Sequence, residues 1–467
     1  MHIKAAAGVY RDTAAMIDKI IARYDRPVPR YTSYPTAPHF TAAITAGHYY
    51  DWLTSLEPEN PISLYLHGPF YREMGWYCGC TTRATHRQAS VSAYHERLLA
   101  EIALTADALP GRIPVRHIHF GGGSPNMLAP DEIAATLELL RRRFAVLDDA
   151  EIAIEINPRT TAEEFIDACA DAGVTRLSLG VQDLNAAVQK AVNRVQSFDT
   201  LTRVAERARQ KGIADINIYL MYALPHQTAA NVARTIKGAL TLDPTRIALF
   251  GYAYVPWMKP HMRLIDDAAL PDAEDRWQQA ETARQQLIAH GYLSVGMDHF
   301  ARPGTALVDA AATRSLRRNF QGYTTDPATS LLPFGASAIG QLPQGYVQNE
   351  ADIRRWTATI DAGNFAIVKG FRTTDDDRMR RDIIEPLMCD MAVDAGAVAE
   401  RRGFTAADLE DSFVALAPMA ADGLLELDGP TVRMTERDKP LVRAAAAAFD
   451  RYFTNGDSNA PRHARAV

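Results

Sequence analysis

The stretch that decides the fold is Ile62-Ser-Leu-Tyr-Leu-His-Gly-Pro-Phe-Tyr-Arg-Glu-Met-Gly-Trp-Tyr-Cys-Gly-Cys80, in which an apolar strand runs into a loop. Gly68 and Pro69 break the strand, and the thiols of Cys78 and Cys80 follow among aromatic side chains. The chain has four cysteines, so half of them lie in this loop. A strand that delivers soft ligands into a barrel-mouth loop is typical of an iron–sulfur site. Such a cluster needs at least three protein ligands, and this loop offers two.

The composition is that of an ordinary globular protein. The 467 residues are 47% hydrophobic and 23% charged, which predicts roughly two or three domains. The formal net charge of −6 gives no general attraction to nucleic acid or to an anionic membrane. Four cysteines do not form a disulfide framework, and no apolar run approaches a signal segment or the roughly 20 residues of a membrane span. We expect a cytoplasmic protein that does not cross a membrane.

The chain divides into three predicted parts. Residues 1–60 contain a helix near 10–24 and a proline-rich arm that includes Arg30-Tyr-Thr-Ser-Tyr-Pro35, which cannot be helical. We expect this arm to be ordered over the next domain. Residues 61–370 alternate short apolar runs with helical stretches, and residues 371–467 are mainly helical.

The alternating region predicts the architecture. Strand-like runs lie at 62–66, 115–120, 151–156, 175–181, 214–222 and 246–254. Between them, Thr161 with Glu164 is a candidate capping box, Asp199 is a candidate cap, and Gly173 and Gly212 end helices. Short strand–helix connections indicate parallel strands with right-handed crossovers. We therefore predict an α/β fold with a partial or complete TIM-like barrel of six (βα) units.

The C-terminal part resembles a winged-helix module. Helical stretches near 375–390, 394–402 and 406–422 precede a hairpin at 424–434 and a final helix, and we expect the last dozen residues to be disordered. The helix that would read DNA carries Asp408, Glu410 and Asp411, which repel phosphate. This favours a lid or packing role over nucleic-acid binding.

In such barrels the chemistry lies at the carboxyl ends of the strands. Gly121-Gly-Gly-Ser124 follows the second run, and its backbone can approach a ligand closely and bind a carboxylate or amine. Glu155 ends the third run, Gln182 ends the fourth, and Arg194 follows. We expect these groups to face one barrel mouth.

The remaining cysteines and two histidines are weaker candidates. Cys169 and Cys389 lie in helical stretches and read as buried apolar residues. His67 and His119 each lie beside a strand end, where structural histidines outnumber metal ligands.

Several strings resemble one family closely. They are Tyr65-Leu-His-Gly-Pro-Phe, Phe120-Gly-Gly-Gly-Ser-Pro, Leu179-Gly-Val-Gln-Asp, Val192-Asn-Arg194, Gly296-Met-Asp-His-Phe-Ala-Arg-Pro and Asn319-Phe-Gln-Gly-Tyr-Thr-Thr. They resemble the oxygen-independent coproporphyrinogen III oxidases, which are radical S-adenosylmethionine (SAM) enzymes of porphyrin and haem biosynthesis. The resemblance implies a radical-SAM (βα)6 barrel, a [4Fe–4S] cluster on three cysteines, two SAM molecules and an electron donor. It also implies oxidative decarboxylation of two propionates of coproporphyrinogen III to give protoporphyrinogen IX. We expect the chain to be a monomer.

The resemblance assigns SAM contacts residue by residue. The first SAM is assigned to Tyr65, Gly122, Glu155 and Ile339. The second SAM is assigned to Tyr77, Gly123, Ser124, Gln182, Arg194 and Ala253.

The chain departs from the family pattern where the cluster is held. The three positions of the Cys-x3-Cys-x2-Cys motif are Tyr71, Gly75 and Cys78, and Cys80 matches a fourth family cysteine that is not a ligand. Tyr219 stands where the family has an Asp at the second SAM, and Ala223 replaces a glycine. One thiolate, even helped by Cys80, leaves a cluster short of protein ligands.

Two hypotheses follow from this mixture. In the first, the chain is a catalytically inactive paralogue that binds a tetrapyrrole, or haem through a thiol or imidazole. In the second, it is a working oxidase that holds a cluster on Cys78, Cys80 and a third ligand such as His67 or Tyr71.

Overall fold

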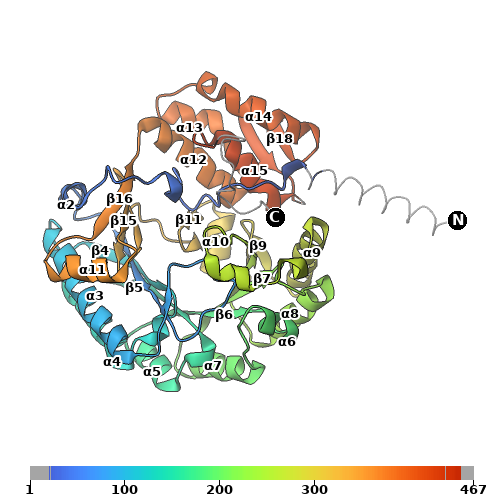
Figure 1. Ribbon diagram of the computed structural model, residues 1–467. Coiled ribbons are helices and arrows are strands. Elements are labelled where there is room, and N and C mark those ends of the chain that lie inside the picture. Colours follow the sequence, from blue (N-terminus) through green and yellow to red (C-terminus); the bar gives the residue numbers. More distant parts are fainter. Residues whose placement is uncertain (1–19, 21–22, 437, 454–467) are drawn as a thin grey trace.

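The computed structural model describes residues 20, 23–436 and 438–453. Most of the strands form one large sheet in the lower part of Figure 1, surrounded by helices, and the C-terminal helices lie above it. The helix predicted near 10–24 falls mostly outside the described residues, and so do the last dozen residues. Among the described residues, no helix is long and apolar enough to cross a membrane.

A twelve-stranded sheet forms the barrel wall, in the order β16-β15-β14-β13-β1-β4-β5-β6-β7-β8-β10-β9. The six predicted runs are all strands in it and pair in parallel along the chain order. They are β1 (Ile62–Gly68), β4 (Pro114–Gly122), β5 (Ala145–Ile156), β6 (Arg176–Gln182), β7 (Asp215–Tyr222) and β8 (Arg246–Gly251). The predicted α/β barrel of parallel strands is confirmed.

The two edges of the sheet extend this parallel core. β13 (Leu331–Phe334) pairs in parallel with β1. Antiparallel strands complete both edges: β14 (Ile339–Leu342), β15 (Gly345–Asn349) and β16 (Ile367–Arg372) on one side, β10 (His299–Ala301) and β9 (Leu293–Val295) on the other. Hydrophobic alternation did not reveal β13 as a further parallel strand, because it is only four residues long.

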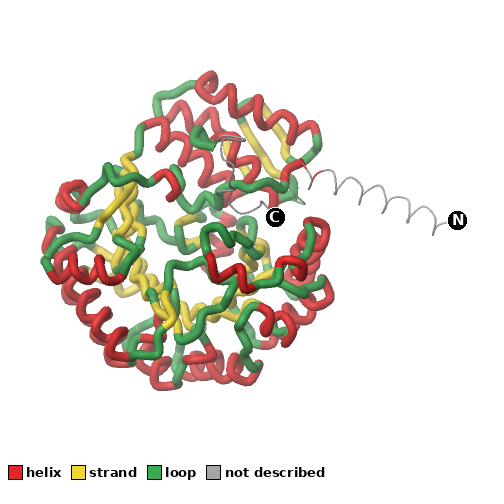
Figure 2. The backbone as a smooth tube through the Cα atoms, viewed as in Figure 1, coloured by secondary structure: helices red, strands yellow, loops and turns green. Residues whose placement is uncertain are grey.

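The outer layer of the barrel is helical (Figure 2). It comprises α2 (Ala46–Thr54), α3 (Gln88–Ala108), α4 (Pro130–Arg143), α5 (Glu163–Asp171), α6 (Ala186–Ala191), α7 (Phe198–Gln210), α8 (Ala229–Thr241), α9 (Ala273–Ala289), α10 (Ala306–Ala312) and α11 (Ile353–Asp361). Gly173 and Gly212, with φ of 83° and 88°, end α5 and α7 as predicted, because glycine adopts this left-handed conformation without a Cβ penalty.

Two predicted helix caps are wrong. Thr161 does not cap α5; its Oγ1 donates to the Asn157 carbonyl at 2.8 Å, and Ala162 is the N-cap. Asp199 lies inside the first turn of α7, whose N-cap is Ser197, with Oγ accepting from Thr200 N at 3.2 Å. Thr161 is engaged with a backbone carbonyl instead, and the Ser197 side chain provides the cap expected of Asp199.

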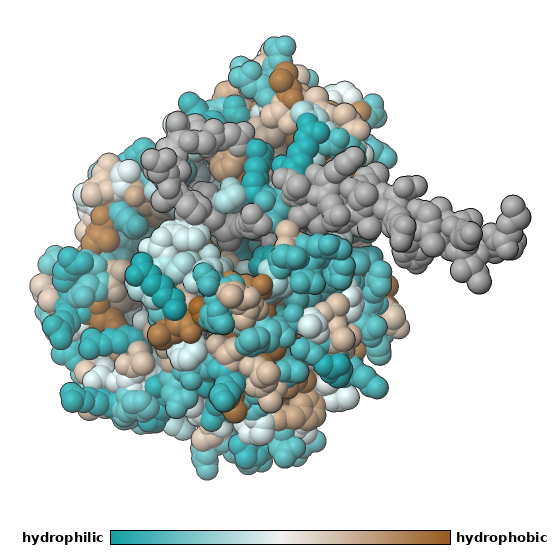
Figure 3. Space-filling model, turned by 45° about the vertical axis from the view of Figure 1, so that its right-hand side comes forward, coloured by the Kyte–Doolittle hydropathy of each residue, from teal (hydrophilic) through white to brown (hydrophobic). Residues whose placement is uncertain are grey.

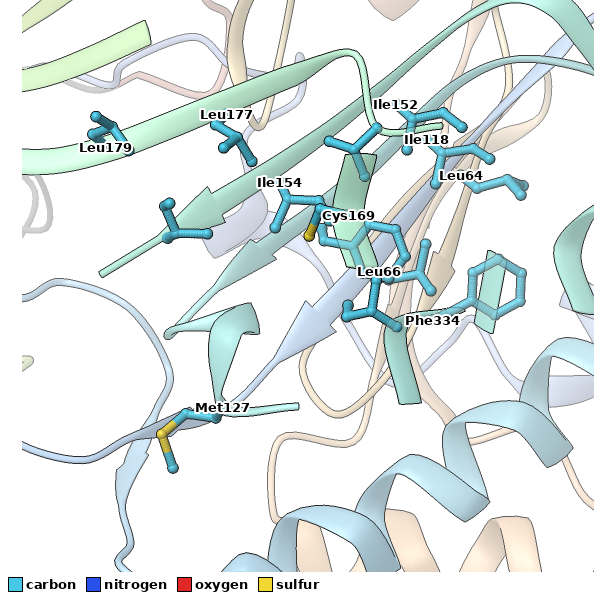
Figure 4. Close-up of a cluster of buried hydrophobic side chains, with 14 of the residues drawn as sticks. Leu64, Leu66, Ile118, Met127, Ile152, Ile154, Cys169, Leu177, Leu179 and Phe334 are labelled. Atoms are coloured by element: carbon cyan, nitrogen blue, oxygen red, sulfur yellow. The ribbon is translucent and has the colours of Figure 1, made fainter. Parts of the chain in front are cut away.

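Apolar side chains on the parallel strands fill the space between the sheet and its helices. Leu64 and Leu66 of β1, Ile118 of β4 and Ile154 of β5 are at most 1% exposed and gather in Figure 4 with the fully buried Cys169 of α5. The prediction that Cys169 is a core residue is confirmed. This packed wall fixes the strand ends in space.

A second hydrophobic core lies in the C-terminal part. It is built by α12 (Asp375–Asp390), α13 (Ala395–Arg401), α14 (Glu410–Ala421) and α15 (Val442–Ala446), with a small sheet of β17 (Ala392–Asp394), β18 (Leu425–Asp428) and β19 (Thr431–Met434). The predicted hairpin is β18–β19, and Cys389 is buried as predicted.

The arm is ordered, but its tyrosines pack mainly into this second core. Tyr31 and Tyr34 are 4% and 1% exposed, and the Tyr31 hydroxyl donates to Asp450 at 3.1 Å. The arm then crosses to the barrel, where Thr41 pairs with Gly370. It therefore lies between the two cores, as the dark blue trace in Figure 1 shows.

Candidate functional site

A cavity of about 680 Å³ lies at the carboxyl ends of the parallel strands. The face drawn in Figure 3 is mostly hydrophilic, and its apolar patches are small and separated. We therefore take the cavity, and not a surface patch on this face, as the candidate site. All ten residues assigned to SAM line it: Tyr65, Tyr77, Gly122, Gly123, Ser124, Glu155, Gln182, Arg194, Ala253 and Ile339. Tyr71, Cys78, Cys80 and Tyr219 line it too. The structure thus brings the predicted site residues together around one space.

The cysteine loop is fixed on both sides of the cavity. The short strands β2 (Phe70–Tyr71) and β3 (Arg83–Ala84) pair in parallel and close the loop at its base. At its tip, Trp76 N donates to the Val192 carbonyl at 3.0 Å. The loop therefore has a defined position over the strand ends.

Tyr71 occupies the volume beside Cys78. Its hydroxyl lies 3.3 Å from Cys78 Sγ and 3.4 Å from the Gly122 carbonyl oxygen, and its single proton is shared between these two acceptors when Cys78 is a thiolate. Cys80 N also donates to Cys78 Sγ, at 3.4 Å. Tyr71 thus links the cysteine loop directly to the glycine run.

These contacts make Cys78 an unusually acidic thiol. The side chain of Cys80, followed by the Tyr71 hydroxyl, the Cys80 amide and the charge of His261, lowers the pKa of Cys78 to about 6 although burial opposes this. The hydrogen bond between the two thiols has the opposite effect on Cys80: it raises the pKa of Cys80, which therefore keeps its proton. A buried Cys78 thiolate and an exposed Cys80 thiol therefore face the cavity together.

The loop does not fit a [4Fe–4S] cluster on the family's three ligands. Gly75 has no side chain, and a Cβ built there would lie 2.5 Å from Tyr77 Cε1. The Tyr71 ring stands where a thiolate would be needed and already bonds Cys78. Across the described residues, no group of three or more His, Cys, Asp or Glu side chains is arranged to hold a metal ion.

His67 does not replace the missing ligand. Its Nε2 donates to the Thr81 carbonyl at 3.1 Å, and its Nδ1 lies 3.0 Å from the Tyr65 hydroxyl. Burial lowers the pKa of His67, so the ring is neutral, with the proton on Nε2 and Nδ1 accepting from Tyr65. Both ring nitrogens are therefore occupied by protein partners.

The glycine run has a different role from the predicted one. Gly123 N donates to the Gly68 carbonyl at 2.7 Å, and Ser124 N donates to the Phe70 carbonyl at 2.8 Å. A Cβ at position 123 would lie 2.5 Å from the Phe70 carbonyl oxygen. These glycines let the loop after β1 pack on the end of β4, and the amides at 123 and 124 are not available to a carboxylate.

Glu155 is the centre of a second hydrogen-bonded group. It accepts from the Tyr219 hydroxyl at 3.0 Å and from Gly122 N at 3.3 Å, and His119 Nε2 lies 3.4 Å away. Burial favours the neutral acid, but His119, Tyr219 and the Gly122 amide outweigh it and lower the pKa of Glu155. Tyr219 therefore bonds a residue assigned to the first SAM.

The half of the cavity around Gln182 and Arg194 keeps unsatisfied polar groups. Within the described part of the chain, Ser124 Oγ, Asn157 Nδ2, Gln182 Oε1 and Arg194 Nε are buried and have no hydrogen-bond partner. All four residues line the cavity. Buried polar atoms are rarely left unpaired, so this half fits a polar ligand such as the nucleoside or amino-acid part of SAM. When bound to a reducing cluster, SAM supplies a carbon radical.

Residues from outside the six parallel strands also line or support the cavity. Arg30 reaches it from the arm, and Phe320 and Gln321 reach it from the turn between β11 (Arg317–Asn319) and β12 (Gly322–Thr324). His261, in the short helix η4 (Pro260–Leu264), bonds the Cys78 carbonyl at 2.7 Å. The arm and turn motifs were visible as strings, but only the fold shows that they meet.

The barrel, the strand-end cavity and the loop after β1 define a protein of radical-SAM type. Residues 76–238 match the model of the Radical SAM superfamily, and residues 373–441 match that of the HemN C-terminal domain. The first match begins after Tyr71 and Gly75.

Full-length relatives narrow this class. The oxygen-independent coproporphyrinogen III oxidase of Bradyrhizobium diazoefficiens is 47% identical over 96% of this chain and 99% of its own length. That of Paracoccus denitrificans is 39% identical, over 95% and 97%. The solved structure of coproporphyrinogen III oxidase (HemN) from Escherichia coli, described as a radical SAM enzyme, superposes with a TM-score of 0.87 at 35% identity and covers 92% of this chain and all of its own. The chain belongs to the oxygen-independent coproporphyrinogen III oxidase family.

Proposed function

We propose that this member of the family binds a tetrapyrrole related to coproporphyrinogen III in its barrel cavity without cleaving SAM. The observation that carries the proposal is the pair Tyr71 and Gly75 at cluster-ligand positions, with the Tyr71 hydroxyl bonded to Cys78 and to Gly122. A phenol engaged in this way is a poor iron ligand for a [4Fe–4S] cluster, which is held by thiolates. Without that cluster, none of the described residues that line the cavity supplies an electron to SAM.

The retained half of the cavity supports the binding role. Ser124, Gln182 and Arg194 keep unpaired buried atoms there, and a ligand that satisfies them recovers the cost of their burial. We assign SAM, or a related nucleoside, to this half and the flat macrocycle to the wider space beside Phe250 and Phe320. This ligand set does not include the altered positions Tyr71 and Gly75.

A second candidate is an oxidase with an unconventional cluster. The lowered pKa of Cys78 favours it, because thiolates bind iron and Cys80 lies two residues away. In this reading Cys78, Cys80 and Tyr71 would hold the iron.

Anaerobic reconstitution separates the two candidates. The full chain is incubated with iron and sulfide, and iron, sulfide and 5′-deoxyadenosine formed from SAM after reduction are counted. We expect neither a stoichiometric cluster nor 5′-deoxyadenosine. The matched control is Cys389→Ala, which removes a buried thiol outside the cavity. About four irons per chain with SAM turnover would establish the oxidase instead.

Ligand binding is tested in parallel. Titration with coproporphyrin III or haem should change the absorption spectrum of the ligand. No spectral change at ligand concentrations on the order of tens of micromolar would refute the tetrapyrrole role.

A further inference from the structure

Two cysteines of the main cavity form a dithiol that the proposed binding role leaves unused. Cys78 and Cys80 both line the cavity of about 680 Å³. The other two cysteines of the chain, Cys169 and Cys389, are buried in α5 and α12 and lie outside that cavity. A pair of neighbouring thiols in a cavity differs chemically from a single buried cysteine, because the pair can be oxidised to a disulfide within one loop.

The two sulfur atoms are close neighbours. The thiol of Cys80 is hydrogen-bonded to Cys78 Sγ, and Cys80 N donates to the same sulfur at 3.4 Å. The Cα atoms of residues two apart are separated by at most roughly 7 Å, and disulfides span about 4.4–6.8 Å between Cα atoms. Gly79, which lies between the two cysteines, has no neighbouring heavy atom within 4 Å of the place that a Cβ would take. The backbone at Gly79 therefore has room to adjust while a disulfide closes.

Hydrogen bonds give the two sulfurs different roles. Cys78 Sγ accepts from Cys80 N and lies 3.3 Å from the Tyr71 hydroxyl, and both contacts stabilise negative charge on that sulfur. Cys80 is exposed and supplies a second thiol beside it. In thiol–disulfide exchange a thiolate attacks first, and a neighbouring thiol then completes the reaction. Cys78 is thus placed as the attacking group and Cys80 as the resolving group.

The position of the dithiol selects small reactants. Lys259 Nζ donates to the Cys80 carbonyl at 3.1 Å, and His261 Nε2 lies 2.7 Å from the Cys78 carbonyl oxygen. Both contacts hold the backbone, so they position the thiols without engaging either sulfur. Cys78 is 6% exposed, and its sulfur is reached through the cavity. A low-molecular-weight disulfide can enter that space, whereas a disulfide on the surface of a folded protein cannot.

We propose that Cys78 and Cys80 form a thiol–disulfide exchange site that reacts with a low-molecular-weight disulfide such as glutathione disulfide. The inference rests on one part of the proposed function, namely that no iron occupies Cys78. The Cys78 thiolate attacks one sulfur of glutathione disulfide, the S–S bond breaks, and one glutathione leaves as a thiolate. Cys80 then gives its proton to solvent and attacks Cys78 Sγ, which releases the second glutathione. The dithiol loses two electrons, and glutathione disulfide gains them.

The test follows one peptide of the full chain. Trypsin cuts after Arg72 and Arg83, so residues 73–83 form a single peptide that contains Cys78 and Cys80 and neither of the other cysteines. The chain is isolated anaerobically, and its iron is counted. It is then reduced, freed of reductant, incubated with glutathione disulfide, alkylated, digested and analysed by mass spectrometry. We expect an internal disulfide, two hydrogens lighter than the dithiol, that dithiothreitol reverses.

Three variants assign the two sulfurs. Cys80→Ala should stop at the mixed disulfide of Cys78 with glutathione. Cys78→Ala should form a mixed disulfide on Cys80 about tenfold more slowly than Cys80→Ala forms one on Cys78, because the Cys80 sulfur lacks the two stabilising contacts. Cys389→Ala, which removes the buried thiol of α12, is the matched control and should form the internal disulfide at the wild-type rate.

The outcomes separate this inference from the proposed function. About four irons per isolated chain would overturn the proposed function and, with it, the inference that rests on it. If the iron-free wild type stays reduced, or stops at a mixed disulfide, the exchange site is refuted and the proposed function stands. Equal rates for Cys78→Ala and Cys80→Ala would refute Cys78 as the attacking group. The wild-type peptide alone decides the question if a variant does not fold.

Discussion

Cys78 offers the sharpest test of the altered loop. Its pKa is held near 6 by four surrounding groups, of which the Cys80 side chain has the largest effect and the Tyr71 hydroxyl comes next among those that lower it. Removing either group should raise the pKa of Cys78, and the order of the two effects is set by the structure. The perturbations are Cys80→Ala and Tyr71→Phe, which delete a thiol and a hydroxyl without adding a polar atom.

The size of the effect follows from one hydrogen bond to a charged acceptor. Such a bond contributes roughly 1.5 kcal/mol, and 1.36 kcal/mol corresponds to one pH unit. Tyr71→Phe should therefore move the pKa of Cys78 from about 6 to about 7. Cys80→Ala should raise the pKa of Cys78 further, because the Cys80 side chain has a larger effect on that pKa than the Tyr71 hydroxyl has.

Alkylation kinetics measure this pKa directly. The rate of Cys78 modification by iodoacetamide is followed against pH by mass spectrometry of the modified peptide. Cys78 is 6% exposed but lines the cavity of about 680 Å³, whereas Cys169 and Cys389 lie outside that cavity and should react only on unfolding. Tyr50→Phe, which removes an exposed phenol on α2, is the matched control and should leave the midpoint unchanged.

Two results would refute this reasoning. If Tyr71→Phe titrates at the wild-type pH, the Tyr71 hydroxyl does not bond the thiolate. If Cys80→Ala shifts the midpoint less than Tyr71→Phe does, the order of contributions is wrong.

Three further predictions concern stability. Burial raises the pKa of Glu101 from 4.5 to about 7, so the stability that Glu101 contributes is complete below pH 4.5 and is lost as the pH rises to about 7. In urea unfolding, the free-energy advantage of the wild type over Glu101→Gln should fall by about 3 kcal/mol between pH 4.5 and 8. A difference that stays constant with pH would contradict this prediction. Tyr219→Phe removes the hydrogen bond to Glu155 and should cost about 1 kcal/mol in urea unfolding at pH 7, with an unchanged midpoint as the contrary result. Thr374→Ala breaks the capping box of α12 and should also cost about 1 kcal/mol, and a loss below the error of the fit would count against the cap.

The sequence predicted the barrel well because its strands are short apolar runs bounded by clear breaks. The run at 62–66 is the inner part of β1, and its apolar side chains point into the core that determines the strand's place. Helix starts were harder to predict, since Thr161 donates to a backbone carbonyl instead of capping α5, and Ser197 provides the cap expected of Asp199. Which oxygen accepts a hydrogen bond depends on distances of a few tenths of an ångström, and residue types alone do not determine them.

The site was predicted as a set of residues but not as a set of contacts. The family strings place Glu155 and Gly122 at a SAM site, whereas the bonds from Tyr219 and Tyr71 to these two positions appear only in the structure. The glycine run was expected to expose amides, and the amides at 123 and 124 instead tie it to the loop after β1. Long-range pairs of this kind have no local signal in the chain.

The two halves of the cavity support opposite conclusions about chemistry and binding. On the cluster side, Tyr71 and Tyr219 satisfy the groups around them, so that Cys78 and Glu155 have protein partners without any ligand. In the half around Gln182 and Arg194, one buried polar atom of each of these two side chains is unpaired, which costs roughly 1–3 kcal/mol of folding stability for each atom. A folded chain tolerates that cost most readily where a bound molecule removes it. The loss of the cluster ligands therefore does not imply loss of the ligand site, and binding and SAM cleavage are separate properties that separate assays can resolve.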